Sequence, residues 1–430
     1  MRRIFVTILS ALCILFTNVS VRAEPGNVVG GAPIVNVKYI HDLIQHEWGV
    51  RVPYNPKLQN PLVAANMRYL LTAVDAANSR LGTSTQYRQT QYATDYAANT
   101  NVTIQAVRTL IGSSKYHFTA TTTSDTTEFS FVINAAGKFS VDWGDGTEEK
   151  IAKYNTSART LTHQYATPGA YEVRIGGVAT AYAASNGKNT AISFESNKNL
   201  AKISGSLGRI FPSVGTDMPV FYRLFHECKN LKGEIPGELF SGLVGAPVKA
   251  MFQDLFNYCI ELTGTIPPEL FAGIQGAPAE SMFRSTFANC QNLRGEIPGT
   301  LFSGIVGAPA PYMFRFTFAS SGLSKIQPGL FSGISGAPAN DMYLGTFYNG
   351  YGLSGEIPVG LFGNISGPLA PHMFDTTFYR CRNLTGLSAR NPEGVPLYEQ
   401  FLNVQATHVQ HMYTEDTKLS DYADIPDVWK

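Results

Sequence analysis

The C-terminal half of the chain repeats with a period of 31 residues, and this repeat limits the possible folds more than any other feature. An apolar pair opens each full unit, and successive openings are 31, 31, 31, 29 and 31 residues apart. Five residues after each opening stands a phenylalanine, and an earlier degenerate unit extends this column to Phe194, Phe225, Phe256, Phe287, Phe318, Phe347 and Phe378. A unit this short cannot bury its own apolar face, so neighbouring units must stack around a shared core. The repeat therefore predicts a solenoid.

The units also repeat a leucine, an Ile-Pro pair, a Leu-Phe pair and a closing Gly-Ala-Pro turn. The string Phe-x-x-Cys-x-x-Leu, followed by Ile-Pro and Leu-Phe, resembles the leucine-rich repeats of bacterial surface proteins of the BspA type over about half of the chain. That resemblance implies a leucine-rich-like solenoid, which we place at residues 189–411. The Ser-Gly-Ile-Val-Gly-Ala-Pro stretch departs from the shorter family units. Because exposed ends need caps, residues 412–430 are predicted to form a C-terminal cap.

Cysteines recur at one position of the repeat, at Cys228, Cys259, Cys290 and Cys381. Asn197, Ser321 and Gly350 hold the same position in other units. A small buried thiol can alternate with Asn or Ser, since each can hydrogen-bond to the backbone inside a turn. We therefore expect a column of free buried thiols in the repeat core, with disulfides between neighbouring coils as the alternative. Neither a Cys-x-x-Cys motif nor grouped histidines accompany the column, so we expect no metal and no cofactor.

Residues 114–188 differ in character, because Thr, Val, Phe and Gly alternate there with the period of two that is typical of half-buried strands. The run from Val141 to Thr147, followed by His163-Gln164-Tyr165 and then Pro168-Gly169-Ala170-Tyr171, resembles a polycystic-kidney-disease (PKD) domain. The resemblance implies an immunoglobulin-like β-sandwich with Trp143 and Tyr165 in its core.

Two carboxylates of this segment, Asp142 and Asp145, invite two interpretations. Asp145-Gly146 has the composition of a tight hairpin turn, which accounts for these residues without an ion. Calcium binding through carboxylate oxygens is the alternative.

Residues 1–23 have the features of a secretory signal peptide, with Met1-Arg2-Arg3, an apolar run from Ile4 to Phe16, and a small residue at Ala23. We expect export by general secretion, and a twin-arginine signal is the alternative. The apolar run is too short to span a bilayer comfortably, and no second run of roughly 18 apolar residues follows it. The mature chain is therefore predicted to lack a transmembrane segment.

Residues 24–113 show the spacing of amphipathic helices, as in Met67, Leu70, Leu71 and Val74. We expect a small helical domain of unknown role. The predicted fold class is thus multidomain α+β, with a small helical N-terminal domain, a PKD-like β-sandwich and a leucine-rich-like repeat solenoid.

Charge and motifs exclude several functions. Three of the 33 basic residues lie in the signal, which leaves 30 against 32 acidic residues and a mature net charge near −2, so we expect no nucleic-acid partner. His41 and His46-Glu47 lack the His-Glu-x-x-His spacing of a zinc protease, so they do not predict a metal site.

A glutamate recurs at one position of the repeat, at Glu234, Glu296 and Glu356. Such repetition is typical of a solvated column, since a catalytic carboxylate pair is unique in its chain. We see no catalytic constellation and expect a protein that is not an enzyme.

Positions that vary between units, while the scaffold does not, are the candidate binding residues. They are Tyr222, Gln253, Arg284, Arg315 and Asp375, with Leu344 at the same position and Arg223, Asp254, Ser285, Phe316, Gly345 and Thr376 beside them. In a solenoid such positions can line an extended surface that selects a partner. Ordinary exposed variation is the alternative for any single residue.

The expected function is an exported, secreted or cell-surface binding and adhesion protein of bacterial type, which presents its repeats to a host or matrix protein or to a glycan. Two other classes stay open. One is an extracellular hydrolase, carbohydrate-active or proteolytic, with residues 24–113 as its seat. The other is a purely structural envelope protein.

Overall fold

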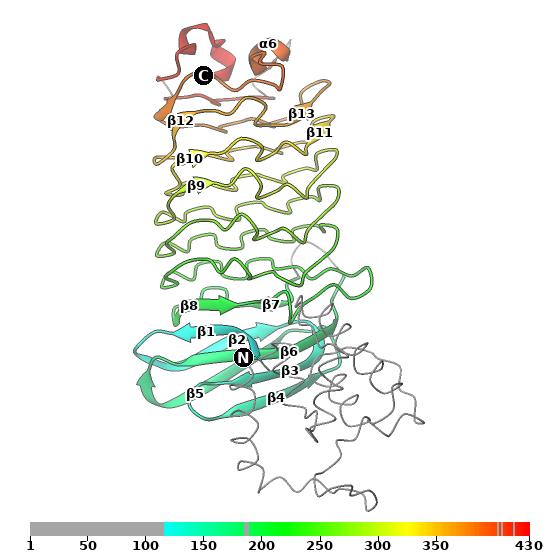
Figure 1. Ribbon diagram of the computed structural model, residues 1–430, viewed down its shortest axis with the longest axis vertical. Coiled ribbons are helices and arrows are strands. Elements are labelled where there is room, and N and C mark those ends of the chain that lie inside the picture. The colour runs from blue at the N-terminus through cyan, green and yellow to red at the C-terminus, as the bar shows by residue number, and fades with distance from the viewer. Residues whose placement is uncertain (1–115, 185–188, 402–403, 406, 416–417) are drawn as a thin grey trace, which may run out of the picture.

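The computed structural model describes residues 116–184, 189–401, 404–405, 407–415 and 418–430. Figure 1 shows two regions, a β-sandwich (residues 116–181) and a tall stack of coils (residues 189–430, called the coil stack below) that rises from the sandwich to the C-terminus. Among the described residues, no helix is long and apolar enough to cross a membrane. The predicted signal peptide and helical domain lie outside the described residues.

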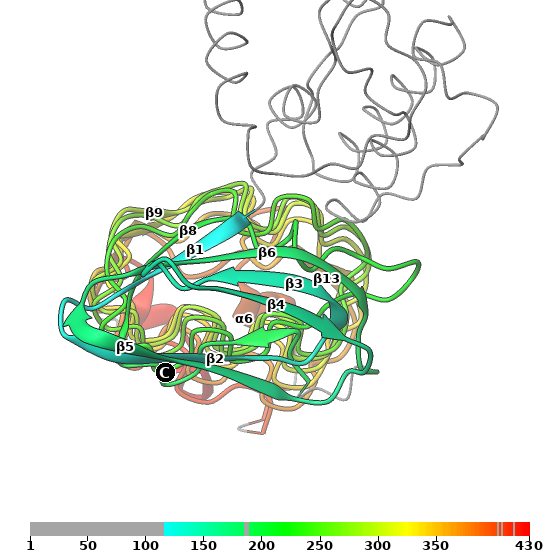
Figure 2. The ribbon, with the colours of Figure 1, turned by 90° about the horizontal axis from the view of Figure 1, so that it is seen from below.

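Six antiparallel strands form the sandwich: β1 (Tyr116–Thr122), β2 (Thr126–Ile133), β3 (Ala136–Asp142), β4 (Glu148–Lys153), β5 (Arg159–Gly169) and β6 (Glu172–Ala181). They form because apolar side chains alternate along them, as with Phe129, Phe131 and Ile133 of β2, which all point into the core. The first sheet has the order β4-β3-β6-β1-β8, and the second has the order β5-β2-β7. Figure 2 shows the two sheets facing each other across the same outline that the coils follow.

The last strand of each sheet belongs to the first, degenerate repeat unit. These strands are β7 (Ile192–Ser193), which pairs with β2, and β8 (Leu200–Gly205), which pairs with β1. The next coil then continues both sheets, since Lys232 N donates to Ala201 O at 2.7 Å and Ala191 N donates to Val220 O at 2.7 Å. The sandwich therefore covers the lower end of the coil stack, and in the described residues both sheets continue by pairing into the first coils.

Within the coils, backbone hydrogen bonds alternate between the neighbouring coil and the same coil. Phe283 N and Ser285 N donate to Met313 O and Arg315 O of the next coil at 3.0 and 2.8 Å, whereas Arg284 N donates to Ser281 O at 3.2 Å. Continuous turns thus replace a long strand. Short parallel strands remain elsewhere in the coils: β9 (Glu296–Ile297) with β10 (Lys325–Ile326), β11 (Ser335–Gly336) with β13 (Asn364–Ile365), and β12 (Ser354–Glu356) with β14 (Asn383–Thr385).

The turns require a left-handed residue at every fourth position. In one coil these are Ser281, Ser285 and Asn289, with φ of 58°, 53° and 59°. A positive φ at the third position of a turn reverses the chain and is uncommon outside glycine. Each such residue stops the two-residue alternation of a strand, so the inward side chains occur as pairs, such as Met282-Phe283 and Thr286-Phe287.

Three aromatic ladders run along the core of the coil stack. The predicted phenylalanine column forms one, with ring centroids 5.3 to 6.0 Å apart from Phe194 to Phe378 and Tyr413 added at its end. The second contains Phe221, Phe252, Phe283, Phe314, Tyr343 and Phe374. The third contains Phe240, Phe271, Phe302, Phe331 and Phe362. Offset stacking between identical positions holds successive coils in register.

The C-terminal tier ends the ladders. It contains α6 (Leu397–Gln400), η1 (Tyr422–Asp424) and η2 (Asp427–Trp429). Trp429 is buried and its carbonyl accepts Tyr413 N at 3.0 Å. The buried carboxylate of Asp421 accepts Ser388 N at 2.8 Å and pairs with Arg390 at 3.2 Å.

The predicted fold class was wrong. The described residues are almost entirely strand and turn, and α6 with four residues is their one α-helix, so an α+β class is not supported. The expected helical domain is not shown, because residues 24–113 are not among those described. Nor do the coils close into a regular leucine-rich-like solenoid, because turns with left-handed residues take the place of a long inter-coil strand, and the parallel strands that remain are two or three residues long.

Candidate functional site

One side of the coil stack carries the residues that lie between the inward pairs, and we call it the outward face. It consists, in each coil, of two residues before the buried pair that ends in the Phe column and two residues after it, such as Tyr222-Arg223 and His226-Glu227 around Leu224-Phe225. The left-handed residue that precedes the other inward pair, such as Tyr312 before Met313-Phe314, also belongs to this face. In nearly every outward pair, the second residue has a left-handed backbone conformation, as Arg223 does with φ 53°. The outward face therefore stands on a rigid turn scaffold.

The structure places the five predicted binding residues in one column of this face. Tyr222, Gln253, Arg284 and Arg315 are partly exposed, and Asp375 is buried. Burial raises the pKa of the Tyr222 hydroxyl, although the neighbouring Arg223 opposes this. Gln253 Nε2 donates to Asp254 Oδ2 at 3.2 Å.

Asp375 serves the local structure. Its Oδ2 lies 2.6 Å from His372 Nδ1, and its Oδ1 accepts Gln410 N at 2.7 Å. Both oxygens are therefore engaged between the last full coil and the C-terminal tier, which leaves this side chain little capacity to bind a partner.

Arg315 stands at the centre of an aromatic cluster. Its guanidinium carbon lies 5.8 Å from the centroid of the Tyr312 ring and 5.4 Å from that of Phe316, and its Nη1 is 3.1 Å from Asp341 Oδ1. Burial lowers the pKa of this guanidinium, and the charge of Arg284 in the preceding coil lowers it further. Cation–π contacts of this kind fix an arginine in one orientation.

The cluster continues into the next two coils. The ring of Phe316 lies over Gly345, where an added Cβ would come within 2.1 Å of Phe316 Cε1, and meets Tyr348 edge to face at 6.1 Å. Tyr348 stacks on Tyr379 at 5.1 Å, and the Arg380 guanidinium lies 5.0 Å from the Tyr379 centroid. We call Tyr312, Arg315, Phe316, Tyr348, Tyr379 and Arg380 the aromatic–arginine patch.

Sequence reasoning missed four members of this patch, namely Tyr312, Tyr348, Tyr379 and Arg380. They lie four residues before or after the predicted columns, and only the turn geometry brings them to the same face. The signal that could have found them is the four-residue spacing of inward pairs, which leaves two outward positions every four residues.

The cysteines lie in the core rather than on a surface. All four are buried thiols outside any disulfide, and each Sγ donates to the carbonyl of a column phenylalanine in the preceding coil, as Cys290 does to Phe256 O at 3.1 Å. Burial raises the pKa of Cys228 and Cys290 to about 12. Four buried threonines, which were missed from the sequence, donate in a similar way to carbonyls of the second aromatic ladder in the preceding coil: Thr286, Thr317, Thr346 and Thr377.

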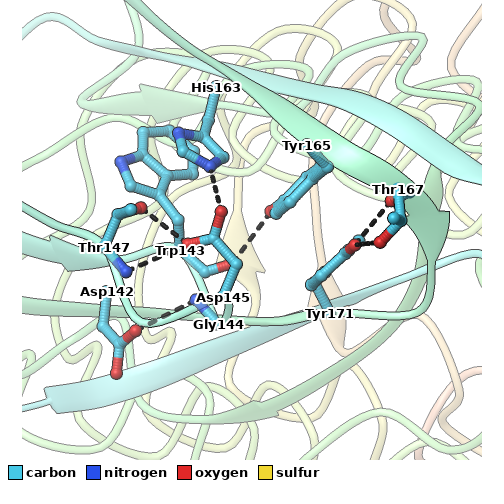
Figure 3. A network of polar contacts seen from close by, with 9 residues as sticks. All are labelled: Asp142, Trp143, Gly144, Asp145, Thr147, His163, Tyr165, Thr167 and Tyr171. Carbon is cyan, nitrogen blue, oxygen red and sulfur yellow. Dashed lines mark hydrogen bonds and ion pairs between the residues drawn. The ribbon is translucent and has the colours of Figure 1, made fainter.

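The turn after β3 holds a network of polar contacts (Figure 3). Asp145 accepts Thr147 N at 3.0 Å and lies 2.7 Å from His163 Nε2, and the His163 ring stacks on buried Trp143. Burial opposes ionisation of Asp145, but the hydrogen bonds from Thr147 and His163 outweigh it and lower the pKa of this carboxyl to about 2. Tyr165 Oη donates to Trp143 O at 2.9 Å.

This network fixes a turn. Asp142 accepts Gly144 N at 3.0 Å and lies 3.6 Å from Arg174, so both carboxylates that we considered as alternative calcium ligands have partners within the protein. Over the described part of the chain, no three His, Cys, Asp or Glu side chains are grouped to hold a metal ion. Glu234, Glu296 and Glu356 lie exposed along one column of the coils. His41 and His46-Glu47 fall outside the described residues.

No family model, no curated protein sequence and no solved structure matches this chain. The resemblances to BspA-type repeats and to PKD domains therefore remain predictions from the sequence.

Proposed function

We propose that this protein is an exported binding and adhesion protein that presents the outward face of its coil stack to a macromolecular partner. The observation that carries the proposal is the aromatic–arginine patch, which extends over three successive coils. Tyrosine and arginine dominate the energy of protein–protein interfaces, because they offer a large contact area and several donors at a low entropic cost.

Rigid support also favours binding. Each patch residue stands on a coil that is hydrogen-bonded to both neighbours, as Phe316 N is to Leu344 O at 2.9 Å and Tyr312 N is to Asn340 O at 3.0 Å. Side chains held in this way lose little conformational freedom when a partner binds. Export is inferred from the signal-like residues 1–23, and the partner can be a host or matrix protein or a glycan.

Arrays of proteins and glycans, probed with the full chain, test this proposal. Tyr379→Ala and Tyr348→Ala are expected to weaken capture of the best array partner by about tenfold or more, which is typical of a central tyrosine. Tyr154→Ala is the matched control, since Tyr154 is 87% exposed on the sandwich. Capture that is unchanged in both patch variants, or arrays on which nothing is captured while the protein hydrolyses a polymer, would contradict the proposal.

A further inference from the structure

Four arginines lie on the outward face, and three of them have a carboxylate partner. Arg223 lies 2.6 Å from Glu195, Arg315 lies 3.1 Å from Asp341, and Arg380 lies 3.1 Å from Glu415. In each pair the carboxylate comes from a neighbouring coil. On the outward face, these three arginines are thus neutralised by carboxylates of neighbouring coils.

Arg284 is the exception. Within the part of the chain that the structure describes, its side chain forms neither a hydrogen bond nor an ion pair, although it is partly buried. It occupies the same repeat position as Arg315, one coil away, and the two backbones are joined by the hydrogen bond from Ser285 N to Arg315 O at 2.8 Å. Asp341 pairs with Arg315, and the Asp254 carboxylate of the preceding coil accepts hydrogen bonds from Gln253 and Asn257. Among the described residues, the Arg284 guanidinium is therefore left without a bonded counter-ion.

Small residues surround Arg284 in its own coil. Ser281, Ser285 and Ala288 are buried from solvent. In the next coil, Tyr312 and Phe316 take the positions of Ser281 and Ser285. Arg284 is itself partly exposed, and among the described residues no aromatic ring lies over its guanidinium, so a ligand group can reach it. The mature chain as a whole is close to neutral, so this positive site is local.

We propose that Arg284, together with Arg315, binds a carboxylate of an acidic peptide segment in the partner. This inference rests on the proposed function and names the chemistry of the partner. Arg–carboxylate pairs can form two parallel hydrogen bonds, which fix the orientation of the bound group. The bound carboxylate would give Arg284 the kind of partner that Glu195, Asp341 and Glu415 give to the other three arginines of the outward face.

The aromatic rings argue for a peptide over a sugar chain. A sugar stacks on a free ring face, but Tyr348 and Tyr379 cover one another with an interplanar angle of 6°. The Phe316 ring lies against Gly345 and also faces the Arg315 guanidinium. The stacked rings therefore offer contact area to a peptide, and the guanidiniums recognise its charge.

Fluorescence anisotropy with a labelled oligoglutamate peptide and the full-length protein tests the inference. The wild type is expected to bind oligoglutamate and not oligoglutamine, with affinity that falls as salt rises. Arg284→Gln is expected to weaken binding by about tenfold or more, as for the loss of a charged hydrogen bond, while Arg284→Lys retains part of it. The control Arg159→Gln removes the same charge from the sandwich, where exposed Arg159 pairs with partly exposed Glu149.

Arg284 has no partner to lose in the described residues, so we expect Arg284→Gln to unfold at the temperature of the wild type. Equal oligoglutamate binding by Arg284→Gln and wild type, or no binding by either, would overturn the inference. Binding of polygalacturonate that depends on Arg284, without binding of oligoglutamate, would overturn the choice of a peptide. If Tyr379→Ala abolishes array capture while Arg284→Gln has no effect on any ligand, the proposed function stands and this inference fails.

Discussion

The sandwich and the coil stack bury the same kinds of side chain in opposite ways. In the sandwich, strands far apart in sequence pair antiparallel, and alternation with a period of two places Phe129 and Phe131 in the core. In the coil stack, each coil contacts the coil before and the coil after it, and turns with left-handed residues place inward pairs every four residues. One core can therefore be built from long-range strand pairing at one end and from repeated local turns at the other.

The two regions meet at Phe194. Its ring lies 5.2 Å from Phe131 of the sandwich and 5.7 Å from Phe225 of the coil stack. Because β7 and β8 also belong to both regions, the boundary near residue 188 separates two sequence patterns and not two cores. The predictions below test how far the regions behave as one body.

The largest expected effect comes from removing this shared ring. Phe194→Ala should lower the free energy of unfolding by about 3–5 kcal/mol, because it leaves a cavity between both regions. Hydrogen exchange should show lost protection in β2 and in the coils together. Phe378→Ala is the control at the far end, and it should leave β2 protected. Loss of protection in only one region of the Phe194 variant would show that the regions are independent.

The next effect concerns the upper end of the coil stack. Asp421→Ala should cost about 1–3 kcal/mol, because Ser388 N and the Arg390 guanidinium lose their buried acceptor. Chemical denaturation measures this loss. Asp427→Ala is the matched control, since the Asp427 side chain is fully exposed in the same tier. Equal stability of the two variants would mean that the upper end contributes little, unlike the end that the sandwich covers.

A smaller effect distinguishes the regions by pH, because the described cysteines all lie in the coil stack. Burial raises the pKa of Cys228 and Cys290 to about 12 from an ordinary value of 9.0. The folded state therefore holds these protons more tightly, so their contribution to stability is complete below about pH 9 and is lost as the pH rises toward 12.

Denaturation of the wild type should thus show a steeper loss of stability above pH 9 than that of a variant with Cys228, Cys259 and Cys290 changed to serine. Thiol reagents at neutral pH should label these cysteines only after unfolding. Rapid labelling of the native protein, or parallel pH curves for both proteins, would contradict the buried-thiol description.

The smallest effect belongs to the sandwich. Asp145 has its pKa lowered to about 2 from 3.8, so its contribution is complete above about pH 4 and is lost as the pH falls toward 2. Asp145→Asn should cost less than about 1 kcal/mol at neutral pH, because solvent screens the pair with His163. Asp125→Asn, in the exposed turn between β1 and β2, is the control. A larger loss would make this turn a major support of the sandwich.

The candidate surface was only partly predictable. The variable column identified Arg284 and Arg315, because substitutions at one phase of a repeat indicate positions outside the shared core. It also contained Asp375, whose burial depends on the non-repetitive segment around Gln410. The tyrosines of the patch were missed, since helical or strand spacing does not place Tyr312 and Tyr348 beside Phe316.

The sequence by itself determined what is buried. The spacing of apolar residues predicts the buried column from Phe194 to Phe378 and the alternation around Trp143. The reason is that removal of apolar side chains from water is favourable whatever path the backbone takes. The backbone path was decided only in the tertiary structure. Ser285, Phe316 and Thr376 share one left-handed conformation with Gly345, although their side chains do not favour it. Hydrogen bonds to the neighbouring coils impose that conformation, and no single unit contains them.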